Sequence, residues 1–412
     1  MPWLNPGWAK ARSDLFIAAL RLHRVFMMLE SKKMKSNLSA CVDWLDGRLA
    51  TSKSMIDPAE GNRVVVTPPS TLTIRTAKDA LFFAVPVVST SFASMSRLFS
   101  DYGRGAYGWL LIDEAGQAAP QMAVGALARS RRAVIVGDPV QLEPVVTVSV
   151  AVQETLRKHQ DPVVGHEWMP CNTSVQELAD QSNPFGTWAG EGEDRRWIGS
   201  PLVVHRRCDN PMFSIANQIA YNGKMVFGVI RKTNDDNPSA SFEPSSWIDI
   251  SSNEATDHWI PAEGEALIEL VERLMGSGIK PESIFVISPF RSVVAGCRNV
   301  LRGINSELYR RAKAAATDKN KPVKAGQIQV GTVHTVQGKE ADTVVMVLGG
   351  NPERPGAKEW AAQKPNLLNV GLTRAKRRIF IIGNRAAWSR VRYFQETAWT
   401  LPQMATQAKV PN

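Results

Sequence analysis

The stretch WLLIDEAGQ, residues Trp109–Gln117, joins an apolar run to two adjacent acids and a turn of small residues. A short apolar run of this kind is typical of a strand buried on both faces of a parallel sheet. Asp113 and Glu114 follow at its carboxyl end, where such sheets bind their ligands. One acid there can hold Mg²⁺ through water while the other activates the attacking water of nucleotide hydrolysis. An acidic pair that caps a helix is an equally good interpretation of this stretch alone.

The stretch AVIVGDPVQLEP, residues Ala133–Pro144, has a similar arrangement further along the chain. Its apolar run ends in a Gly-Asp-Pro turn, and Gln141 follows. An amide at this place can contact a terminal phosphate, or the water that attacks it, without adding charge. The interval from Asp113 to Gly137 fits neighbouring parallel strands joined by one helix. An ordinary turn is the alternative interpretation of this stretch.

Short runs of β-branched and apolar residues recur along the chain and end in small or polar residues. They predict strands of a parallel sheet in an α/β fold. Upstream, apolar residues spaced by three and four predict an amphipathic helix over residues 9–30, and turn-forming residues predict loops with one short strand over residues 50–76. The predicted strands are residues 82–89, 108–112, 133–136, 283–288, 328–332, 343–348 and 378–382.

Length, charge and cysteine usage restrict the class of protein. The chain has 412 residues, enough for two or three domains, and its formal net charge of +10 favours an anionic partner such as nucleic acid. Its four cysteines lie far apart, which argues against a zinc site or a disulfide framework. No apolar run approaches the ~20 residues of a membrane-spanning helix, and the N-terminus lacks the pattern of a secretion signal. We therefore expect a soluble, cytoplasmic protein with no membrane partner.

Two stretches interrupt the strand pattern. Residues 146–200 are rich in Trp, Pro and Gly and predict a loop-rich insertion at a domain boundary. Residues 305–327 are rich in Lys and Arg and predict a segment that is helical at first and then irregular. The sequence thus predicts two domains, residues 1–200 with the insertion at 146–200, and residues 201–412.

The ordered motifs carry a resemblance to a known family. The DEAGQ and GDPVQLEP runs resemble motifs II and III of the superfamily 1 helicases of the DEAG-box branch, which includes the nonsense-mediated-decay helicase and related bacterial AAA-type helicases. Other segments resemble the family's remaining motifs in the family's order. They are residues 204–208 with 221–223 for the arginine finger, 287–290 for motif IV, 331–340 for motif V, 369–376 for motif VI, and 88–92 for an upstream strand end that contacts nucleic acid.

This resemblance implies an α/β fold of two RecA-like parallel-sheet domains, the first incomplete at its N-terminus, with ATP between them and nucleic acid across both. It implies an ATP-dependent helicase or translocase. The roles at the phosphates would be Asp113 as the Mg²⁺ ligand, Glu114 as the catalytic base, Gln141 as the γ-phosphate sensor, and Arg207 and Arg374 as the arginines that counter developing charge.

Further roles follow from the same resemblance. Glu340 would accept the ribose hydroxyls, and Gln337 and Gly338 belong to the same nucleotide-binding motif. Single-stranded DNA or RNA would contact Ser89, Thr90, Pro289, Thr332 and His334. Two alternatives stay open, since Arg374 can pair with a local carboxylate and His334 can be a core histidine.

The family's phosphate-binding loop, G-x-x-x-x-G-K-[ST], does not occur in these residues. Only two Gly-Lys pairs exist, and Met225 and Glu340 follow them. Because backbone N–H groups and the lysine of that loop cradle the phosphates, we expect a chain that starts after the loop and has weak ATP binding and negligible turnover. The rival interpretation is a non-catalytic nucleic-acid-binding or interaction module derived from a helicase. A nuclease that uses Asp113 and Glu114 is disfavoured, because no further acids cluster with them.

Overall fold

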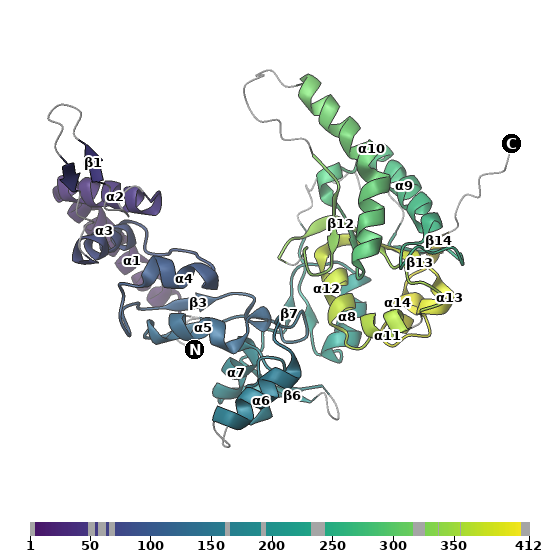
Figure 1. Ribbon diagram of the computed structural model, residues 1–412, viewed down its shortest axis with the longest axis horizontal. Coiled ribbons are helices and arrows are strands. Elements are labelled where there is room, and N and C mark those ends of the chain that lie inside the picture. The colour runs from purple at the N-terminus through teal and green to yellow at the C-terminus, as the bar shows by residue number, and fades with distance from the viewer. Residues whose placement is uncertain are drawn as a thin grey trace. The chain divides into compact units, whose positions relative to one another are not determined.

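The computed structural model describes residues 5–47, 54–56, 63–65, 71–160, 165–190, 195–231, 244–315, 326–336, 338–354 and 356–404. It contains two compact units (Figure 1). Unit 1 comprises Met1–Leu111 and Met122–Val134, and unit 2 comprises Ile112–Gln121 and Ile135–Asn412. These units do not coincide with the predicted ranges 1–200 and 201–412, and that division stays a prediction.

Unit 1 is mainly helical. The side chain of Asn5 caps its first helix by accepting hydrogen bonds from the backbone of Gly7 and Trp8, and a proline stands in the first turn, as helix starts favour. The helices are α1 (Pro6–Leu29), α2 (Ser31–Leu45), α3 (Thr71–Ala84), α4 (Phe92–Phe99) and most of α5 (Pro120–Ala128); β1 (Ser54–Ile56) and β2 (Arg63–Val65) form an antiparallel pair. A second pair, β3 (Leu110–Ile112) with β4 (Ala133–Ile135), crosses the boundary between the units.

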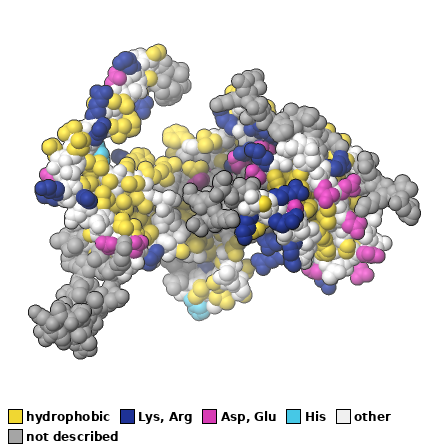
Figure 2. All heavy atoms as spheres, turned by 90° about the horizontal axis from the view of Figure 1, so that it is seen from above, with side chains coloured by type: hydrophobic (Ala, Val, Ile, Leu, Met, Phe, Trp, Pro, Cys, Tyr) yellow, Lys and Arg dark blue, Asp and Glu magenta, His cyan; other side chains and the backbone are white. Residues whose placement is uncertain are grey.

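The predicted helix at residues 9–30 is confirmed, but none of the residues of α1 is buried. Leu15, Leu22 and Leu29 are each more than two thirds exposed. Hydrophobic side chains are accordingly visible on the surface of the N-terminal helices (Figure 2). Within the described residues, no helix is long and apolar enough to cross a membrane.

The predicted strand at residues 82–89 is wrong, because its first part belongs to helix α3. Phe82 packs at 5.9 Å, between ring centroids, from both Phe99 and Tyr102. Lys78 on the same helix is buried, pairs with Asp101 and lies over the Trp44 ring. A short apolar run fits a buried helix face as well as a strand, and here the helix contacts decide.

Unit 2 is built on a six-stranded sheet in which every pair is parallel, with the order β11-β10-β12-β13-β9-β14. The predicted strands at 283–288, 328–332, 343–348 and 378–382 are confirmed. The strands are β9 (Ser246–Asp249), β10 (Ile284–Ser288), β11 (Gln329–Thr332), β12 (Ala341–Val347), β13 (Ala375–Gly383) and β14 (Gln403–Met404). The α/β fold class is therefore confirmed.

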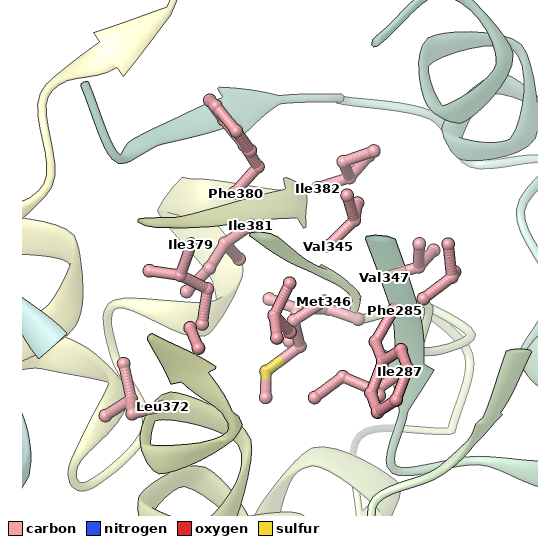
Figure 3. Packing of buried hydrophobic residues seen from close by; sticks show 14 of the residues in the cluster. Phe285, Ile287, Val345, Met346, Val347, Leu372, Ile379, Phe380, Ile381 and Ile382 are labelled. Atoms are coloured by element: carbon pink, nitrogen blue, oxygen red, sulfur yellow. The ribbon is translucent and has the colours of Figure 1, made fainter. Parts of the chain in front are cut away.

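Helices pack against this sheet to form the main core, part of which Figure 3 shows. Every residue of β10 is buried, as the continuous apolar sequence predicts. Gly371 is needed where α12 passes β12, because a Cβ atom there would lie 2.0 Å from Cε of Met346. The helices are α8 (Met212–Tyr221), α9 (Pro261–Gly276), α10 (Arg291–Ala315), α11 (Gly356–Ala361), α12 (Asn366–Arg374), α13 (Arg385–Trp388) and α14 (Phe394–Thr400).

The predicted loop-rich insertion at 146–200 contains more regular structure than expected. Helix α6 (Val150–Gln160) is followed by α7 (Val175–Ser182), which starts in a capping box between Ser174 and Glu177. Strands β5 (Gly186–Ala189) and β6 (Arg196–Gly199) then form an antiparallel hairpin. Its two tryptophans, Trp188 and Trp197, pack on each other with their ring centroids 5.6 Å apart. Strands β7 (Val204–His205) and β8 (Val226–Phe227) form a parallel pair beyond it.

Candidate functional site

Asp113 and Glu114 stand in the turn after β3, as predicted. The backbone N–H of Glu114 donates to Oδ1 of Asp113 at 3.0 Å. Glu114 has a φ of +54°, in the left-handed region that is uncommon for a residue with a side chain. A Cβ atom on Gly116 would lie 2.9 Å from the carbonyl oxygen of Asp138. The acidic turn therefore lies directly against the turn that follows β4.

Asp138 organises the turn after β4. Its carboxylate accepts hydrogen bonds from the backbone N–H of Val140 at 3.0 Å, from Nε2 of Gln141 at 3.0 Å and from the Tyr221 hydroxyl at 2.5 Å. Because Nε2 of Gln141 faces Asp138, Oε1 of the same amide faces Arg374. This oxygen accepts a hydrogen bond from Nη2 of Arg374 at 3.3 Å. Asp138 thus orients the side chain that the sequence predicts as the phosphate sensor.

Arg374 ends helix α12 and is completely buried. Its Nη1 donates to the carbonyl oxygen of Lys339 at 3.3 Å, while its Nε has no hydrogen-bond partner among the described residues. Burial lowers the pKa of Arg374, and the nearby positive charge of Arg207 lowers it further. The negative charges of Glu114 and Glu340 act in the opposite direction. The charges of Arg207, the second predicted arginine, and of Glu114, the predicted base, therefore both act on Arg374.

Arg207 contacts the acid of the predicted ribose site. Its Nε lies 3.3 Å from Oε2 of Glu340, and Nζ of Lys376 lies 2.6 Å from Oε1 of the same carboxylate. The hydrogen bond from Lys376 is the main cause of the lowered pKa of Glu340, and the charges of Arg207 and Arg374 add to it. Both carboxylate oxygens thus have cationic partners in this structure.

Asn369 connects α12 to the same group. Its Nδ2 donates to the carbonyl oxygen of Val140 at 3.0 Å and to the Tyr221 hydroxyl at 3.0 Å. Burial and the Asp138 charge raise the pKa of Tyr221, so its hydroxyl stays protonated and donates. Asp138, Tyr221 and Asn369 were not predicted as site residues. All three lie inside the quoted motifs, which is the signal that could have found them.

The residues predicted to contact nucleic acid fall into two groups. Pro289 follows β10, Thr332 ends the neighbouring parallel strand β11, and His334 lies just beyond it. The backbone N–H of Val333 donates to the Ser288 carbonyl at 3.2 Å. Pro289 is buried, Thr332 is half-buried and His334 is exposed. Partial desolvation of the ring and the Arg291 charge lower the pKa of His334.

The other predicted residues are placed as follows. Ser89 and Thr90 lie exposed between α3 and α4 of unit 1. Gly338 is exposed and has a φ of +75°, which favours glycine. Gln337 lies outside the described residues. No group of three metal-ligating side chains occurs in the part of the chain that the structure describes.

Two family models, each described as an AAA domain, match residues 70–149 and 194–386. Curated relatives include the DNA replication ATP-dependent helicase/nuclease DNA2 of Gallus gallus, 24% identical over 309 residues that cover 74% of this chain and 26% of that protein. The regulator of nonsense transcripts 1 homolog of Drosophila melanogaster is 30% identical over 119 residues, 28% of this chain and 9% of that protein. The chain spans about a quarter of the length of the DNA2 relatives that it matches.

Among solved structures, the chain is similar to the PRRSV helicase, with 13% identity over 73% of this chain and 40% of that chain and a TM-score of 0.31. A complex of an Arterivirus nonstructural protein 10 helicase with DNA matches 69% of this chain and 41% of that chain, with 11% identity and a TM-score of 0.29.

Proposed function

Because the chain is a superfamily 1 helicase-like protein, we propose that unit 2 binds the phosphates of a magnesium–nucleoside triphosphate complex and serves an ATP-dependent motor on nucleic acid. In this proposal Asp113, Glu114 and Gln141 supply the acidic and amide groups. Arg207 and Arg374 supply the cationic ones.

One observation carries the proposal. Arg374 is completely buried beside a second arginine, yet its Nε has no partner among the described residues. Burying a guanidinium near a like charge is unfavourable unless an anion compensates both groups. Glu114 and Glu340 supply part of this compensation. A polyphosphate beside the two arginines would supply the remaining negative charge, so the residues present fit this ligand.

Each residue has a stated task under this proposal. The bound triphosphate would supply the phosphoryl group that reacts. Asp113 would hold Mg²⁺ through its carboxylate, and the Glu114 carboxylate would take the proton of the attacking water. Asp138 keeps the Gln141 amide turned towards Arg374, at 3.3 Å between Oε1 and Nη2. The guanidinium groups of Arg207 and Arg374 would donate hydrogen bonds to phosphate oxygens, where such groups stabilise developing charge.

The proposed nucleic-acid contacts lie at the ends of β10 and β11. Thr332 is the last residue of β11 and His334 lies two residues beyond it, and the net charge of +10 favours a polyanionic partner. The names of the matched relatives include a DNA replication helicase and a regulator of nonsense transcripts. We propose single-stranded nucleic acid as the partner, with DNA and RNA to be separated by direct binding measurements.

A non-catalytic nucleic-acid-binding module is the second candidate. The observation that favours it is the lack of a Gly-Lys-Ser or Gly-Lys-Thr sequence in the 412 residues. Under both candidates the 412-residue chain hydrolyses little ATP, so turnover does not separate them, whereas binding of the triphosphate does.

The test is equilibrium binding of Mg·ATP to the wild-type chain, to Arg374→Gln and to Arg385→Gln. Arg385 is a matched control, since its guanidinium bonds the backbone carbonyls of Ala398 and Leu401. We expect weak binding by the wild type and the control, and a loss of about tenfold or more in Arg374→Gln. Equal binding by all three chains, or none by the wild type, would favour the non-catalytic module.

A further inference from the structure

We propose that Arg231 is a positioning residue that fixes the segment of Arg207 against the segment of Arg374. This inference rests on the proposed function. It concerns a residue that no predicted motif includes.

Arg231 contacts both segments with one guanidinium group. Its Nη2 donates to the carbonyl oxygen of Arg207 at 3.0 Å and to the carbonyl oxygen of Lys376 at 2.9 Å. Lys376 belongs to β13, two residues after Arg374, and is 145 residues from Arg231 in the chain. We call this guanidinium, bound to the carbonyls of Arg207 and Lys376, the clamp. It joins the backbone of Arg207 to the backbone two residues after Arg374.

Asp209 orients the clamp. Nε of Arg231 donates to its two carboxylate oxygens at 3.1 and 3.3 Å. The backbone N–H of Asp209 donates to the same Lys376 carbonyl at 2.8 Å. A planar guanidinium can serve a carboxylate and two carbonyl groups at once, whereas the compact ammonium group of lysine is less suited to this geometry.

The clamp is suited to positioning more than to stabilisation. The side chains of Arg231 and Asp209 are 32% and 30% exposed, and ion pairs this exposed contribute little to the free energy of folding. By contrast, displacement of a positioning group by about 1 Å can cost up to ~10²-fold in function. Loss of Arg231 should therefore change the phosphate site while the fold persists.

The experiment compares Arg231→Gln and Arg231→Lys with the control Arg385→Gln, each as the full 412-residue chain. Mg·ATP affinity and the unfolding temperature are measured for every chain. We expect Arg231→Gln to weaken Mg·ATP binding about five- to tenfold with little change in unfolding temperature, Arg231→Lys to recover part of the affinity, and Arg385→Gln to keep it.

A double-mutant cycle identifies the route of the effect. If Arg231 acts through Arg207, then Arg231→Gln should weaken Mg·ATP binding far less in an Arg207→Gln background than in the wild type. If the wild type binds Mg·ATP and Arg231→Gln binds it with equal affinity, the inference is overturned. Fully additive losses in the cycle would overturn it as well.

A second readout does not depend on nucleotide. Cys208 is buried directly after Arg207, and Cys297 is buried on α10. Release of the clamp in Arg231→Gln should raise the alkylation rate of Cys208 by iodoacetamide by about tenfold while Cys297 stays protected, as local opening predicts. Unchanged protection of Cys208 would refute the clamp. Absence of Mg·ATP binding by the wild type, with faster alkylation of Cys208 in the variant, would instead refute the proposed function alone.

Discussion

The hydroxyl of Tyr221 donates a 2.5 Å hydrogen bond to the carboxylate of Asp138, which lies 83 residues earlier in the chain. Asn369 donates to the same hydroxyl from α12. The Tyr221 hydroxyl thus connects the turn after β4 to helices α8 and α12. The Asp138 carboxylate also accepts a hydrogen bond from Gln141, so the same contacts hold the Gln141 side chain in place.

Tyr221→Phe should destabilise the chain, because it removes a donor from Asp138 and an acceptor from Asn369. Both groups keep other partners, but the lost hydrogen bond to the charged carboxylate is worth about 1.5–3 kcal/mol. Urea denaturation should therefore show a lower free energy of unfolding for Tyr221→Phe. The control is Tyr309→Phe on α10, where Tyr309 is 45% exposed, and its change should stay within about 0.5 kcal/mol. Equal stability of the two variants would contradict the role of the Tyr221 hydroxyl.

Glu263 predicts a pH dependence of stability. It is fully buried near the start of α9, and burial raises its pKa to about 8. Between the ordinary carboxyl pKa and about 8, the folded chain binds a proton at Glu263 that the unfolded chain has lost. This contribution to stability is therefore complete at low pH and declines as the pH rises towards 8.

Glu263→Gln should remove this dependence, since an amide cannot ionise and its oxygen can still accept the 2.8 Å hydrogen bond from the Gly349 backbone. At pH 8 the variant should be more stable than the wild type, by on the order of a few kcal/mol, and near pH 5 the two should be similar. Thermal unfolding from pH 5 to 8 measures this. Glu272→Gln on the exposed side of the same helix should follow the wild type at every pH. Parallel curves for wild type and Glu263→Gln would contradict the buried-carboxyl account.

The contacts proposed at Thr332 and His334 predict a specific salt behaviour. The lowered pKa of His334 means that its ring is mainly neutral at pH 7. The double substitution Thr332→Ala/His334→Ala should weaken binding of single-stranded oligonucleotides by about tenfold, through lost hydrogen bonds. It should leave the slope of affinity against salt unchanged, because no charge is removed. Fluorescence anisotropy at several salt concentrations, with DNA and RNA of one sequence, measures both quantities. Thr400→Ala on α14 is the control, and an altered slope would show that His334 binds as a cation.

The strands of unit 2 were predictable because they are buried on both faces. β10 and the later parts of β12 and β13, residues 344–347 and 379–382, are continuous apolar runs, and these runs indicate a parallel sheet. Strand β9 was missed, since Ser246–Asp249 offers only four residues of mixed character. Residues 82–84 were assigned to a strand because their apolar character does not show that Phe82 packs beside Phe99 as part of a helix.

The site was predictable only as far as the motifs extend. Arg374 and Gln141 were both named from motifs, and the structure brings them together across 233 residues. Arg231 was not named, because a side chain that bonds to distant backbone carbonyls leaves no pattern in the sequence around it. Tyr221 belongs to a recognised motif but received no predicted role. In the sequence its partner Asp138 is an ordinary turn residue, and only the structure shows that the two residues are in contact.

A phosphate site shared by the acidic turn and the two arginines is the central element of the proposed function. Dissociation constants of Mg·ATP and Mg·ADP for the wild-type chain and for Arg207→Gln/Arg374→Gln test this directly. Both chains must be folded, as judged by their circular dichroism. We expect the double variant to bind Mg·ATP at least about tenfold more weakly and Mg·ADP nearly as well as the wild type, because the arginines would contact the terminal phosphate. Identical Mg·ATP constants for the two folded chains would contradict the shared site.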